Sequence, residues 1–178
     1  LISALALTSC ALVPKETVEL STTVGRDITE VRGTHRALAE TLFGRMKKDV
    51  DRFIDNVYAP YQIQVVLSKQ KARQDAGNSQ NLFSVLELAL KQPNDALAQK
   101  DVVLVMQAIV EAVHEDVEDY RKIRMEPLLA QEKAVLLEID RVYDQIERGN
   151  AVVTAHLASV VKVNDMQDEL LKKADLAG

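Results

Sequence analysis

The sequence predicts an all-α protein, an elongated bundle of about three long, kinked helices with coiled-coil-like packing. The 178 residues are 47% hydrophobic but include only six Gly and four Pro, so a sizeable core is combined with few turn residues. Apolar residues recur three or four positions apart over long stretches, which is the period of an amphipathic helix. A single short segment alternates as a strand would, and one strand has no partner to form a sheet.

The first helix is expected to begin after Pro14. An apolar stripe runs at helical spacing from Leu20 to Val57, and we expect this stripe to face the core. His35 lies in the middle of the stripe, where an ordinary core histidine is favoured and a pH sensor is the alternative. Pro60 is predicted to kink or stop the helix near Tyr58, because proline has no backbone N–H.

The segment 61–67 fits either a strand or a helix. Its apolar residues alternate with mostly polar ones, but no second segment offers a strand partner. We therefore favour a helix that continues after the proline to about Arg73. Turn residues cluster at positions 75–79, and they predict a loop.

A second helical region is predicted from about Gln80, with a turn or kink at residues 92–95. At Pro127 this region ends or bends, or a separate helix begins there. A third region, 136–174, keeps a strict alternation of three and four residues. Its heptads place Asn150 and Asn164 at position a and Gln167 at position d, where polar residues fix register or partner choice. We expect the three regions to run up, down and up in one domain over residues 15–178.

The beginning of the sequence carries its most specific motif. An apolar run ends in Leu7-Thr8-Ser9-Cys10, and Cys10 is the one cysteine. The run is much shorter than the roughly 20 residues of a membrane-spanning helix. The four residues resemble the lipobox of bacterial lipoprotein precursors. The resemblance implies a truncated signal peptide over 1–9, acyl chains on Cys10, and a short tether over 10–14. Since Ala11 is not the Asp of an inner-membrane retention signal, it also implies the outer membrane, with the chain facing the periplasm.

Catalytic motifs are absent from the sequence. A net charge of −5 argues against nucleic-acid binding, and neither a Gly-rich phosphate loop nor a nucleophile elbow occurs. Glu111 and His114 form a Glu-x-x-His pair similar to half of a di-iron site, but a complete site needs a second pair. We therefore predict no enzyme activity, no cofactor, no small-molecule substrate and no metal, with Glu111 and His114 as weak candidates.

Long helices with wide apolar seams and polar register residues suit assembly with other chains. The sequence thus predicts a lipid-anchored helical lipoprotein that acts as a structural or adaptor component of a bacterial envelope assembly. Its partner would be another protein or further copies of itself. Two alternatives stay open: a soluble coiled-coil interaction protein, and a helical-bundle metalloenzyme built around Glu111 and His114.

Overall fold

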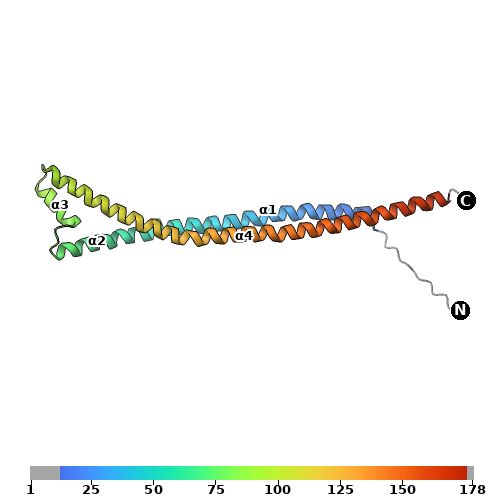
Figure 1. Ribbon diagram of the computed structural model, residues 1–178, viewed down its shortest axis with the longest axis horizontal. Helices are drawn as coiled ribbons and strands as arrows, with labels where there is room; N and C mark the ends of the chain where they lie inside the picture. The colour runs from blue at the N-terminus through green and yellow to red at the C-terminus, as the bar shows by residue number, and fades with distance from the viewer. Residues whose placement is uncertain (1–12, 176–178) are drawn as a thin grey trace, which may run out of the picture. The chain divides into compact units, whose positions relative to one another are not determined.

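A computed structural model describes residues 13–175 of the chain (Figure 1). Five helical segments follow one another: α1 (Lys15–Phe53), the π-helical turn η1 (Ile54–Tyr58), α2 (Ala59–Asp75), α3 (Leu82–Lys91) and α4 (Ala96–Asp175). The described residues contain no strand. The predicted all-α class, with long helices that pack against one another, is confirmed.

The predicted irregularity at Pro60 takes the form of the π-helical turn η1. The Ala59 N–H donates to the Ile54 carbonyl across this wider turn, and α2 then starts with Pro60 in its first turn. Because helix continues from α1 through η1 into α2, Pro60 removes one backbone hydrogen bond from a helix interior, and the irregular turn lies directly before it. The chain continues as helix through 61–67, as favoured from the sequence.

The two predicted breaks lie where the turn residues cluster. Gly77 has a φ of +76°, a left-handed conformation that glycine adopts without strain, and it follows the end of α2. Asn81 caps α3, because its Oδ1 accepts from the Ser84 N–H at 2.9 Å. Its side chain is fully enclosed, with 1% of the residue exposed. Residues 92–95 separate α3 from α4.

Pro127 lies inside the 80-residue helix α4. The predicted reversal between the second and third regions is wrong, because one helix continues through this proline. Contacts with η1 and α1 hold α4 on both sides of Pro127. Before the proline, Arg121 donates to Asp55 of η1 at 2.8 Å. After it, Glu132 accepts from Lys47 of α1 at 2.8 Å. These contacts compensate for the loss of the one backbone hydrogen bond that a proline removes from a helix interior.

The fold contains two compact units, and α1 and α4 contribute to both. Unit 1 combines the described residues up to Ala39 with those from Ala134 onward, and unit 2 comprises Glu40–Lys133. The single domain expected over 15–178 stays a prediction. Within residues 13–175, no helix has the length and hydropathy needed to cross a membrane.

Candidate interaction surface

The seam between α1 and α4 in unit 1 is polar. The Asn150 Nδ2 donates to the Ser21 carbonyl at 3.0 Å, and the Ser21 and Thr154 hydroxyls lie 2.6 Å apart. Because the Thr154 hydroxyl already donates to the Asn150 carbonyl, Ser21 is the donor of this pair. A Cβ at Gly25 would lie 2.7 Å from Asn150 Nδ2. Glycine at position 25 therefore makes room for the Asn150 amide.

Arg32 is the centre of the charged part of this seam. Its Nε and Nη2 donate to Asp140 Oδ1 at 3.1 and 2.9 Å, and its Nη1 donates to Asp144 at 2.8 Å. Arg36 bonds the second oxygen of Asp140. The hydrogen bonds from Arg32 and Arg36 lower the pKa of Asp140 below its ordinary value. Such charge-assisted bonds also fix geometry, so they set the register of α1 on α4.

The apolar stripe predicted to face the core lies largely on the outside of unit 1. Leu20 and Leu38 are 64% and 66% exposed, and Val24 and Val31 are exposed as well. The residues of α1 that contact α4 are the ones directly after stripe residues, such as Ser21 after Leu20 and Arg32 after Val31. Successive residues are rotated by about 100° around a helix, so the stripe itself is turned away from α4. The expectation of a core-facing stripe is therefore wrong for these residues, because polar pairs occupy the seam.

A second exposed stripe follows α4 in unit 1. Its members are separated by seven, four and seven residues, which places them on one helix face; they are Val135, Val142, Ile146 and Val153. A groove of about 410 Å³ runs beside them, with Ile139 and Tyr143 in its wall. We call the two stripes together the apolar face: Leu20, Val24, Val31 and Leu38 of α1 with Val135, Val142, Ile146 and Val153 of α4.

His35 connects the two stripes of the apolar face. It is exposed, so the expectation of an ordinary core histidine is wrong. Its Nδ1 lies 2.7 Å from the Tyr143 hydroxyl in a hydrogen bond, and the two rings meet edge to face. His35 also lines the α4 groove, because the stripe that carries it is rotated away from the polar seam. The two stripes therefore lie on the same side of the helix pair.

The residues predicted to determine specificity have different surroundings. Asn150 is half-buried in the seam and bonded to α1. The Asn164 Nδ2 is buried and has no hydrogen-bond partner among the described residues, and Gln167 is exposed. Cys10 lies outside the described residues. A role for Asn150, Asn164 and Gln167 in register or partner choice stays a prediction.

Glu111 and His114 lie on α4 in unit 2. Over residues 13–175, no three His, Cys, Asp or Glu side chains gather where they could hold a metal ion. Glu111 instead borders a shallow surface groove with Val103, Met106 and Val110. The weak metal candidates therefore have no further ligand among the described residues.

The Arg32 cluster was not predicted from the sequence. An 11-residue spacing would have indicated it: Ser21, Arg32 and Phe43 of α1 and Ile54 at the start of η1 are each buried or half-buried. An 11-residue repeat corresponds to 3.67 residues per turn, so it follows a nearly straight helix. The apolar stripe of α1 lies on the neighbouring helix face.

Comparison of the chain with known protein families, with curated proteins and with solved structures finds no match.

Proposed function

We propose that the protein is a helical adaptor of the bacterial envelope, which binds a partner protein through the apolar face of unit 1. The observation that carries this proposal is the exposure of large aliphatic side chains on one side of the α1–α4 pair. Contiguous apolar surface of this kind marks interaction sites in proteins. The matching partner is an amphipathic helix or helix pair, in another copy of the chain or in another protein.

The polar seam supports this reading. Polar contacts of Arg32, Asn150 and Ser21 hold α1 against α4. The side chains of the apolar face are therefore not needed for this helix pairing and remain exposed for binding a partner. Burying one fully exposed Val or Leu side chain contributes about 1.5–3 kcal/mol, and because the side chains of the apolar face are already partly covered, each would contribute about half of that on binding. The eight side chains of the apolar face together would offset an association cost of about 4–15 kcal/mol.

A pair of substitutions on the apolar face tests the adaptor function. We expect Leu38→Ser combined with Ile146→Ser to abolish assembly of the full chain, whether with itself in analytical ultracentrifugation or with a partner in cells by photo-crosslinking. Helix content should not change, because both side chains are exposed. Val152→Ser is the matched control, since Val152 is 70% exposed on another face of α4. Equal losses in both variants, or no assembly of the wild-type chain, would refute the proposal.

The membrane anchor rests on the lipobox resemblance of Leu7-Thr8-Ser9-Cys10. Acyl chains on Cys10 would hold the adaptor at the outer membrane, because two or more chains give stable anchoring. Intact-mass measurement of the mature protein, made in a bacterium from a complete precursor, tests this. We expect acyl mass on Cys10 and release of Cys10→Ser from the membrane fraction. Unmodified Cys10 in the soluble fraction would instead favour a soluble coiled-coil interaction protein.

A further inference from the structure

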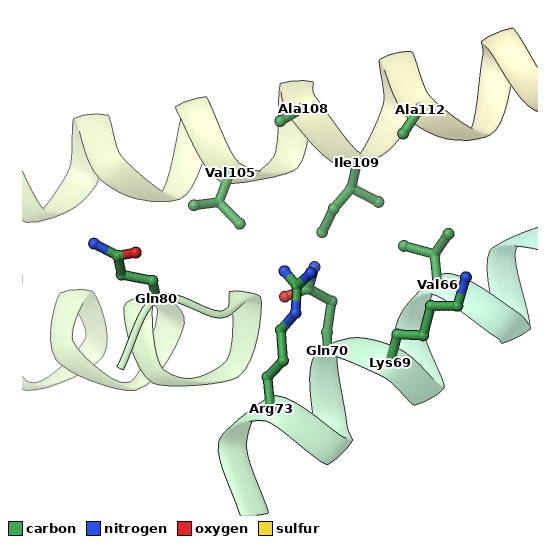
Figure 2. Close-up of a pocket in the computed structure, with 9 residues that line it drawn as sticks. All are labelled: Val66, Lys69, Gln70, Arg73, Gln80, Val105, Ala108, Ile109 and Ala112. Atoms are coloured by element: carbon green, nitrogen blue, oxygen red, sulfur yellow. The ribbon is translucent and has the colours of Figure 1, made fainter. Parts of the chain in front are cut away.

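A pocket of about 380 Å³ lies between α2 and α4, inside unit 2 (Figure 2). Val66, Lys69, Gln70 and Arg73 of α2 form one side. The other side belongs to α4, and Gln80 contributes from the loop before α3. Figure 2 shows Arg73 extending from α2 towards α4, and Val66 pointing towards Ile109. A volume in this range suits a small ligand.

Two positive charges enter this pocket without a counter-charge. Lys69 and Arg73 are four residues apart and so lie on one face of α2, and neither makes a salt bridge with any residue in 13–175. No acidic residue lines the pocket. Their neighbour Lys71, in contrast, pairs with Asp75 at 2.7 Å. Like charges at this spacing destabilise a helix, and an anion between them would relieve the repulsion.

The opposite wall is apolar. Val105 and Ile109 of α4 point towards α2, and Ala108 and Ala112 beside them leave space because their side chains are small (Figure 2). Gln70 is held in place, since its Oε1 accepts from the Leu82 N–H at 3.1 Å. Its amide NH₂ remains a donor for a second acceptor. The pocket therefore has two exposed cations, Lys69 and Arg73, on its α2 side and an aliphatic wall on its α4 side.

We propose that this pocket binds an aliphatic carboxylate, with its head group on Arg73 and Lys69 and its tail along Val105 and Ile109. The guanidinium fork matches a carboxylate in two parallel hydrogen bonds. The tail gains the hydrophobic contribution of the α4 wall. This site is separate from the apolar face of unit 1, and its test does not depend on partner binding there.

The test is a calorimetric titration of the full chain with sodium octanoate. We expect saturable binding, which Lys69→Gln with Arg73→Gln weakens at least about tenfold, because each charge-assisted hydrogen bond contributes more than a neutral one. The matched control is Lys48→Gln with Lys100→Gln, which removes the same charge from unit 2 outside the pocket. It should bind octanoate as the wild type does.

Ligand variants separate the two halves of the site. Octanol lacks the charge, octylammonium reverses it, and acetate lacks the tail; each should bind at least about tenfold more weakly than octanoate. Ala108→Met should also weaken binding by filling the space beside Ile109. The proposal is overturned if octanoate does not saturate, if octanol binds as well as octanoate, or if the Lys69 and Arg73 variant binds like its control.

Discussion

Replacing Gly25 with alanine tests whether the Asn150 amide holds α1 against α4. The new Cβ would lie 2.7 Å from Asn150 Nδ2, whereas nothing lies within 4 Å of a Cβ at Gly33 in the same helix. Both substitutions gain up to about 1 kcal/mol of helix propensity. At position 25 the amide must leave the Ser21 carbonyl, and losing that bond costs about 0.5–1.5 kcal/mol, with more if the amide stays buried and unpaired. We expect Gly25→Ala to be less stable than Gly33→Ala by about 1–2 kcal/mol.

Thermal unfolding of the full chain, followed by far-ultraviolet circular dichroism, measures this difference. Each kcal/mol corresponds to about 2–4 °C in Tm for a chain of this size. Amide hydrogen exchange around Ser21 localises the effect to unit 1. In an Asn150→Ala background the two glycine variants should become equally stable, because the clash is gone. Equal stability of the two variants in the wild-type background would refute the contact, and so would a difference that persists without Asn150.

Three further predictions concern other contacts. Arg32 lowers the pKa of Asp140 from its ordinary 3.8, so their ion pair contributes stability that is present at neutral pH and lost as pH falls below about 4. Asp140→Asn should therefore make Tm less dependent on pH in the acid range. An unchanged slope of Tm against pH would contradict this. Asn81→Ala should cost about 0.5–2 kcal/mol in denaturant unfolding through loss of the α3 cap, and a neutral result would show that the cap contributes nothing. Ile54 is fully buried, so Ile54→Ala should cost about 2–5 kcal/mol, while exposed Ile123→Ala should stay within about 0.5 kcal/mol; equal costs would refute the burial of Ile54.

The local sequence is sufficient to predict the helices and most of their ends. Apolar spacing of three and four residues fixes helix rather than strand, and Gly77 and the residues around Pro93 mark the two breaks in the chain. Pro60 was correctly predicted to disturb the first helix. The effect of Pro127 on the helix could not be predicted in this way, because a proline is compatible with a helix start, an end or an interior kink. The contacts of α4 with α1 and η1 decide among these.

Long amphipathic helices follow from the residue pattern alone, and the motif at Cys10 raises the hypothesis of a lipid anchor. Which surface each helix face contacts became clear only from the folded arrangement. Ser21, Arg32 and Asn150 form the seam of unit 1 while Leu20 and Leu38 remain exposed, and the α2–α4 pocket joins residues far apart in the chain. This difference arises because helical periodicity reports which residues share a face, whereas the side chains of the opposite helix determine whether that face is buried.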